Sequence, residues 1–245
     1  MNITTGRRIW LTQADAIISR YKPIIFWDTC ALLDVLRIPL LDRPQFTPQT
    51  LQAYEQIESW ITSNRLVSVT SDLVLREFSE HADDIVNNLA TQEQKLKNDV
   101  KEQSRYMTDA AKSTRVSNGI DLLDIQKRVI KLVKKIWRGT YILRGQNEFA
   151  LKADYRVRNY IKPSGGRESY KDCYLWICYI SVLNKVNPTE PTFFFTTNPA
   201  DFAENKKSDK LHPNLIAELP FSNSSYALKM SILYRSLQGY FAAHP

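Results

Sequence analysis

Short apolar runs alternate with segments of helical spacing over the first third of the chain. Residues 24–27 are all apolar, follow a proline and are typical of a buried strand, and residues 66–70 form a second β-like run. Residues 29–36 and 48–61 lie between them, and their apolar positions recur at helical spacing. A further helix follows the second run. This order predicts parallel strands covered by helices.

The pattern changes after residue 83. Up to about residue 160 we expect long polar helices, and the only ambiguous run is 140–143. Beyond this segment we expect a helix over 169–186, a buried strand over 192–196 and a closing amphipathic helix over 226–241. The fold class is therefore α/β with a mostly parallel central sheet. Residues 1–84 and 163–245 would form the catalytic domain, and 85–162 a helical insertion.

Composition narrows the class of protein. Apolar residues make up 43% of the 245 residues, which is enough for a substantial core. No apolar run reaches about 18 residues, so no membrane-spanning helix is expected. The first residues lack the apolar stretch of a secretory signal, and the three cysteines form no CxxC pair. Together these features predict a cytoplasmic protein.

Positive charge is concentrated in the predicted insertion. The net charge of the chain is +7, but residues 85–162 hold 17 Lys and Arg against 8 Asp and Glu, whereas the remainder holds 16 against 18. A basic segment on an otherwise near-neutral chain is a candidate surface for a polyanion. A solvated helical face would give the same count, and the charge alone leaves both interpretations open.

Two clusters of cationic residues stand out in this segment. Over 127–138 they interleave with apolar residues at helical spacing, so that one face would pack and the other would be cationic. Over 155–160 arginines alternate with tyrosines that could stack on bases. We expect both clusters to contact the phosphates of a nucleic acid. The candidate nucleic-acid-binding residues are Lys127, Lys131, Lys134, Lys135, Arg138, Arg156 and Arg158.

Acidic and amide residues sit where the predicted strands end. Asp28 follows the first strand, Glu77 lies in the helix after the second, and Asp172 lies in the first turn of a later helix. Asn198 and Asp201 follow the third strand. The carboxyl ends of parallel strands meet at one edge of a sheet, so these side chains should converge. Desolvated carboxylates are costly unless a cation compensates them.

These residue types favour a hard divalent cation. Mg²⁺ and Mn²⁺ prefer oxygen ligands, and such an ion can activate water for hydrolysis of a phosphodiester. The three histidines show no zinc-ligand spacing. The sequence therefore predicts a Mg²⁺ or Mn²⁺ site with hydrolytic chemistry.

Four motifs in order resemble those of PIN domains. Residues 26–33 (FWDTCALL) are similar to the opening "DTxxLL" motif, and 73–78 (LVLREF) to the second motif, a Glu within a helix. Residues 165–176 are similar to the third, an Asp that opens a helix, and 195–202 (FTTNPADF) to the fourth. The resemblance covers about residues 23 to 220. It is closest to PIN-like proteins with a long helical insertion between the second and third motifs.

The resemblance implies a three-layer α/β/α fold and a metal-dependent nuclease, usually an endoribonuclease. It maps Asp28, Glu77 and Asp172 to metal-binding acids. Asn198 takes the fourth position, where many members carry Asp, so one firmly held metal is expected rather than two. Nearby Asp201 would either supply the missing charge or only cap the following segment. Thr29 and Thr196 would be hydroxyls that orient carboxylates.

Two other functions stay open at this point. A catalytically weak or inactive PIN-like module could bind RNA or a protein partner. The neutral Asn198 favours that alternative, whereas three retained acids, which would repel each other without metal, oppose it. Another α/β phosphohydrolase acting on a small substrate is the second alternative. RNA is the expected substrate rather than DNA, and a homodimer or a regulatory protein partner is an open alternative.

Overall fold

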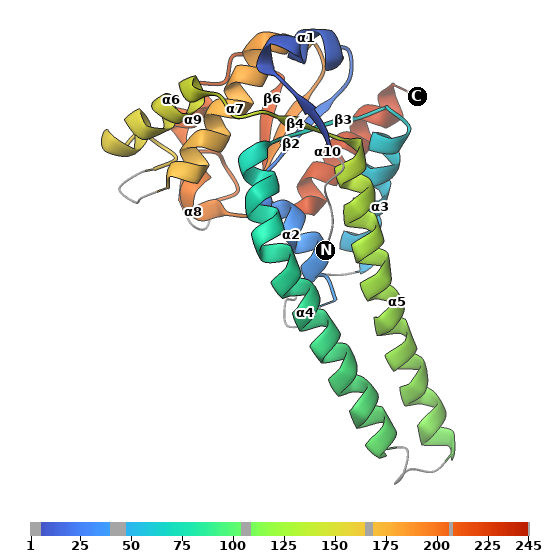
Figure 1. Cartoon of the computed structure of the whole chain (residues 1–245). Coiled ribbons are helices and arrows are strands. Elements are labelled where there is room, and N and C mark those ends of the chain that lie inside the picture. Colours follow the sequence, from blue (N-terminus) through green and yellow to red (C-terminus); the bar gives the residue numbers. More distant parts are fainter. Residues whose placement is uncertain (1–5, 40–47, 104–108, 165–168, 206–207, 245) are drawn as a thin grey trace.

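A computed structural model describes residues 6–39, 48–103, 109–164, 169–205 and 208–244. Its centre is a six-stranded sheet in the order β1-β4-β3-β2-β5-β6, and every neighbouring pair is parallel (Figure 1). The strands are β1 (Arg7–Ile9), β2 (Ile24–Trp27), β3 (Val67–Ser71), β4 (Thr140–Leu143), β5 (Thr192–Phe195) and β6 (Ser224–Ala227).

Helices cover both faces of this sheet (Figure 1). One layer contains α2, α3, α5 and α10, which pack on one another, and the other contains α1, α6 and α7. The helices are η1 (Leu11–Gln13), α1 (Ala14–Ile17), α2 (Thr29–Arg37), α3 (Pro48–Thr62), α4 (Asp72–Gln103), α5 (Asp109–Gly139), α6 (Asn147–Arg158), α7 (Tyr170–Val186), α8 (Pro199–Phe202), α9 (Pro213–Ile216) and α10 (Met230–Ala243). The predicted three-layer α/β/α fold with a parallel sheet is confirmed.

The middle of the sheet is buried on both faces, as expected for parallel strands under two helical layers. All residues of β2 are buried, and Phe26 pairs with Val69 of β3 and Phe194 of β5. Aromatic side chains fill the space beneath α7, where Trp176 packs edge-on to Phe194. This packing fixes the carboxyl end of β2 between those of β3 and β5.

Three short strands were not predicted. β1 and β6 form the two edges of the sheet, and β4, the ambiguous run over 140–143, lies between β3 and β1. Because Ser224–Ala227 is a strand, the last helix begins at Met230 and not at residue 226 as predicted. Short edge strands carry little hydrophobic periodicity, and tertiary pairing decides their conformation.

The most extended feature is the hairpin of α4 and α5, which projects away from the α/β body (Figure 1). With 32 residues α4 is about 48 Å long at the usual rise of an α-helix. At the root, Phe78 of α4 packs edge-on to Trp137 of α5 at a centroid distance of 5.2 Å. Farther out, the Gln126 side chain donates to the backbone oxygen of Leu89. These contacts hold the two helices side by side where they leave the sheet.

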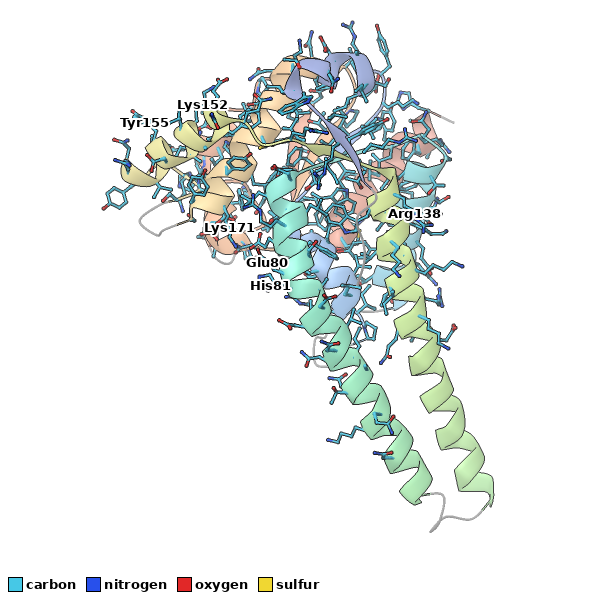
Figure 2. The ribbon with its side chains drawn as sticks, in the orientation of Figure 1. Glu80, His81, Arg138, Lys152, Tyr155 and Lys171 are labelled. Carbon is cyan, nitrogen blue, oxygen red and sulfur yellow. The ribbon has the colours of Figure 1, made fainter. Side chains whose placement is uncertain are left out.

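The predicted insertion at 85–162 includes more than this hairpin. Strand β4 is part of the sheet, and α6 packs on α7, where Lys152 and Tyr155 point outward (Figure 2). The division of the chain at residues 85 and 162 stays a prediction. Residues 165–168, with which the third motif begins, lie outside the described residues. No helix in the described parts of the chain is long and apolar enough to cross a membrane.

Candidate active site

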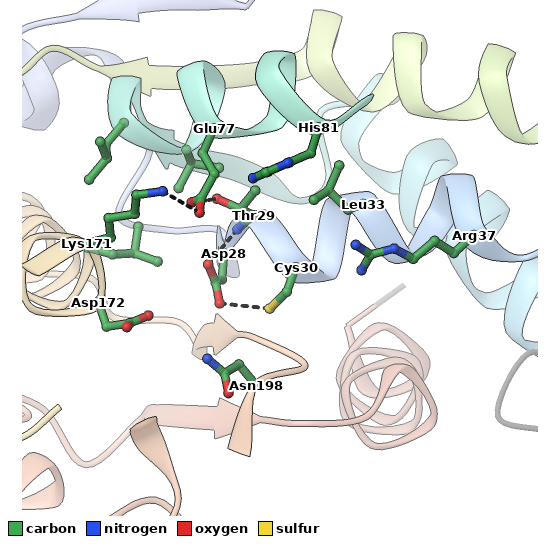
Figure 3. Close-up of a pocket in the computed structure, with 13 residues that line it drawn as sticks. Asp28, Thr29, Cys30, Leu33, Arg37, Glu77, His81, Lys171, Asp172 and Asn198 are labelled. Carbon is green, nitrogen blue, oxygen red and sulfur yellow. Dashed lines mark hydrogen bonds and ion pairs between the residues drawn. The ribbon is translucent and has the colours of Figure 1, made fainter. Parts of the chain in front are cut away.

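A cavity of about 300 Å³ opens at the carboxyl edge of the sheet (Figure 3). It lies beyond the end of β2, whose two neighbours β3 and β5 are reached by connections on opposite faces. Crevices at such a reversal of strand order are the usual binding sites of open α/β sheets. The side chains that line it are Asp28, Thr29, Cys30, Leu33, Arg37, Leu73, Val74, Glu77, His81, Lys171, Asp172, Leu175 and Asn198.

Asp28 lies at the bottom of this cavity and begins α2 as its N-cap residue. Its Oδ1 accepts a hydrogen bond from the Thr29 backbone N–H at 2.6 Å. Its Oδ2 accepts one from the Thr196 hydroxyl at 2.5 Å and one from the Cys30 thiol at 2.9 Å. Burial nevertheless raises the pKa of Asp28, against the effect of these hydrogen bonds and with a smaller contribution from Glu77. The carboxylate is thus held in one orientation while burial disfavours its charge.

Glu77 reaches the cavity from the second turn of α4. Its Oε2 accepts from the Thr29 hydroxyl at 2.7 Å, and its Oε1 pairs with the Lys171 ammonium at 2.9 Å (Figure 3). Three helices, α2, α4 and α7, therefore meet at one carboxylate. Both oxygens of Glu77 are already engaged in the structure.

Asp172 faces the cavity from the first turn of α7. Loss of hydration raises its pKa to about 8, and the negative charges of Asp28, Asp201 and Glu77 add to this rise. Helix N-termini normally favour a carboxylate, so the environment of this acid overrides that preference. A nearby positive charge would therefore favour the ionised form of Asp172.

The fourth corner of the cavity is formed by Asn198 at the end of β5. Its side-chain oxygen accepts from the Ala200 backbone N–H at 3.2 Å and thereby caps α8. Its Nδ2 donates to Asp201 at 2.6 Å, so the amide holds that acid beside the cavity. Asn198 lines the cavity, whereas Asp201 lies behind it.

Comparison with known proteins gives one match. A family model described as PIN domain matches residues 25–202, which is most of the chain and includes all four corners of the cavity. The chain belongs to the PIN domain family. PIN domains are generally metal-dependent nucleases, and most act on RNA. No curated protein and no solved structure matches this chain.

The side chains around the cavity of this PIN domain can be compared with the ligands that a divalent cation prefers. The donor chemistry fits, because carboxylates and an amide oxygen are the ligands that Mg²⁺ and Mn²⁺ prefer. Burial raises the pKa of both Asp28 and Asp172 at the same cavity, and a cation there would favour their ionised forms. In the parts of the chain that the structure describes, however, no three His, Cys, Asp or Glu side chains stand close enough to form a complete metal cluster. The residues therefore fit such a cation in the type of their donor atoms and in their charge, and not as a complete set of ligands around one point.

Four ionisable lining residues were not among the predicted site residues. Lys171 precedes Asp172, His81 follows Glu77 by one helical turn, and Arg37 forms an ion pair with buried Asp34 at 3.0 Å. The spacing of four residues between Glu77 and His81 could have indicated a shared helix face. The Cys30 thiol contacts Asp28, and burial raises its pKa well above the usual range.

The predicted nucleic-acid-binding residues do not gather at this cavity, and several already have acidic partners. Lys135 pairs with Glu58 at 3.2 Å. On α6, Arg156 pairs with Glu218, and Arg158 pairs with Asp154 at 2.7 Å. The members of the set that form no ion pair among the described residues are Lys127, Lys131, Lys134 and Arg138.

Proposed function

We propose that this PIN domain is a divalent-metal-dependent endonuclease that hydrolyses phosphodiester bonds, with RNA as its preferred substrate and Mg²⁺ or Mn²⁺ as its cofactor. The observation that carries this proposal is the pair Asp28 and Asp172. Both line one cavity at the carboxyl edge of the sheet, and both have a raised pKa there. A site that only contributed to folding would gain nothing from two poorly compensated acids.

Asp28 and Asp172 would hold the principal ion, and Glu77 would ligate it or act as a base through water. When bound, the ion supplies an activated water and neutralises charge on the phosphate. The chain supplies the orientation, since Thr196 and the Thr29 backbone fix the Asp28 carboxylate. Asn198 offers a neutral oxygen or orients water, so one firmly held ion is proposed.

Lys171 would serve a role that the sequence did not predict. Its ammonium lies 2.9 Å from Glu77 at the rim of the cavity, and its side chain is half exposed. In the protein without metal it neutralises part of the acidic charge. A phosphodiester that enters the cavity must pass this cation, which would attract one of its oxygens.

Cleavage should depend on added metal. We expect the protein, purified with EDTA, to cut labelled single-stranded RNA when Mn²⁺ is added and to stop when EDTA is restored. Double-stranded RNA and both forms of DNA in parallel reactions test the preference for RNA. Full activity in excess EDTA would refute the metal mechanism.

The outward face of α5 is proposed to guide the nucleic acid. Lys127, Lys131 and Lys134 lie on this face and form no ion pair among the described residues. Changing all three to Glu should weaken RNA binding and lower the slope of affinity against salt by about three. The variant with all three changed to Arg keeps the charge and should bind like the wild type. Equal affinity of the Glu and Arg variants across a salt series would exclude this surface.

A second candidate function is a PIN-like module that binds RNA or a protein without cutting. The ion pair between Lys171 and Glu77 favours it, because it occupies the third acid. This candidate predicts RNA binding with no cleavage of any substrate, and no heat of Mn²⁺ binding in a calorimetric titration. The three free cysteines suit a reducing cytoplasm under either function.

A further inference from the structure

A larger hollow lies at the opposite, amino edge of the sheet. Its volume is about 670 Å³, and it shares no residue with the cavity around Asp28. Its floor consists of the buried residues Ile61, Leu66 and Val67. Gly139, where α5 ends, passes so close to Ile61 that a Cβ atom would collide with it. Because Gly139 has no side chain, its backbone can lie against Ile61 at the floor of the hollow.

Four cationic side chains from three segments surround this hollow. Arg7 comes from β1, Lys22 from the loop before β2, and Lys135 and Arg138 from the last turns of α5. The one acid among the described lining residues is Glu58. The fold therefore brings residues from distant parts of the sequence together as a strongly positive concave surface.

Glu58 does not neutralise this surface. Its Oε1 accepts from the Thr62 hydroxyl at 2.6 Å, and its Oε2 accepts from Lys135 at 3.2 Å. The other three cations, Arg7, Lys22 and Arg138, form no ion pair among the described residues.

The arrangement matches the chemistry of phosphate recognition. A concave surface with apolar walls concentrates the potential of its charges, so three uncompensated cations attract an anion strongly. Guanidinium groups bind phosphate oxygens in pairs, and the hollow has two of them. The Arg7 guanidinium also lies over the Tyr141 ring at 6.0 Å, which restricts its motion. We infer that this hollow binds the phosphate groups of a ligand.

An RNA strand is the first source of such phosphates. Lys131 and Lys134 precede Arg138 by seven and four residues, so all three lie on one face of α5, which leads to the hollow. Arg138 projects from α5 on the side away from His81 and Lys171 (Figure 2). Phosphates bound here would be far from the acids. The hollow would anchor a ligand rather than cut it, so the inference goes beyond the proposed cleavage.

The test measures binding in EDTA, so that nuclease activity plays no part. Fluorescence anisotropy with a labelled single-stranded RNA is compared for the wild type, Arg7→Glu, Lys22→Glu and the double variant. We expect the double variant to bind on the order of tenfold more weakly and its salt slope to fall by about two. Arg235→Glu, an exposed charge reversal on α10 outside the hollow, is the matched control and should change the affinity much less.

A second arm uses a nucleoside triphosphate as the ligand. Loss of nucleotide binding in the double variant with unchanged RNA binding would identify a free nucleotide as the phosphate source. If the double variant binds both ligands as the control does, the inference is wrong. A second double variant, Arg7→Gln with Lys22→Gln, removes both charges without reversing them. If it unfolds at the wild-type temperature and still binds more weakly, misfolding is excluded as the cause of the weaker binding. A failure of cleavage in Mn²⁺ would affect the proposed function and leave this result unchanged.

Discussion

Asp28→Asn is expected to reduce RNA cleavage in Mn²⁺ by at least about 100-fold, because residues that only orient metal ligands already account for up to that much. The substitution keeps the size of the side chain and the oxygen that caps α2 through Thr29. It removes the charge that would hold the metal. The measurement is the initial rate of cleavage of a labelled RNA at saturating protein.

The fold of this variant should persist. An amide avoids the penalty of a buried carboxylate, so the unfolding temperature of Asp28→Asn should not fall. Asp15→Asn is the matched control, since Asp15 is an exposed acid on α1 outside the cavity, and its activity should equal that of the wild type. Wild-type cleavage by Asp28→Asn would show that the activity does not depend on this site.

Asp172→Asn is expected to stabilise the metal-free protein at alkaline pH. The pKa of Asp172 is about 8 in the folded protein and near 3.8 in the unfolded chain. Between these values the folded state binds more protons than the unfolded state, so the free energy of unfolding falls as the pH rises. The contribution of the protonated acid is complete below about pH 4 and lost above about pH 8. An asparagine does not titrate and removes this dependence.

The size of the effect follows from the shift. One pKa unit corresponds to about 1.4 kcal/mol, and partial exposure of Asp172 reduces the full amount. The stability gained by Asp172→Asn should therefore grow by about 3 kcal/mol between roughly pH 5 and pH 8.5. Urea unfolding in EDTA at several pH values measures it. A gain that is the same at every pH would mean that Asp172 ionises normally.

Without metal, Asp172→Asn should be more stable than the wild type at alkaline pH. Metal should reverse this order. Added Mn²⁺ is expected to bind the folded wild type and to raise its unfolding free energy according to its concentration. Asp172→Asn, in which one proposed ligand is removed, should gain much less. If Mn²⁺ stabilises the two proteins equally, Asp172 is not a ligand.

The sequence predicted the buried centre of this fold well and its edges poorly. β2 and β5 are apolar runs apart from Thr192, and β3 alternates valine with small hydroxyl residues; all three strands are fully buried, as expected where helices cover both faces of a parallel sheet. β6 carries the sequence SSYA, and β1 has only three residues, so neither pattern indicates a strand. Their conformation depends on pairing with β5 and β4, which the local sequence does not contain.

A similar limit applies to the candidate site. The places of Asp28 and Asp172 follow from where strands end and helices begin, which the sequence predicts. Lys171 was missed because its partner Glu77 lies 94 residues earlier in the chain. The positive charge was counted correctly, but Lys135 is paired with an acid 77 residues away. Charge partners of this kind require the tertiary structure.

The α4–α5 hairpin has a consequence for how this protein can vary. It leaves the sheet at the end of β3 and returns at the start of β4, and these two strands are neighbours. Matched removal of whole helical turns from the outer parts of α4 and α5 would leave both attachment points, the register of the strands and the cavity in place. The length of the α4–α5 hairpin can therefore change in steps of about 5 Å without any change in the residues around the cavity.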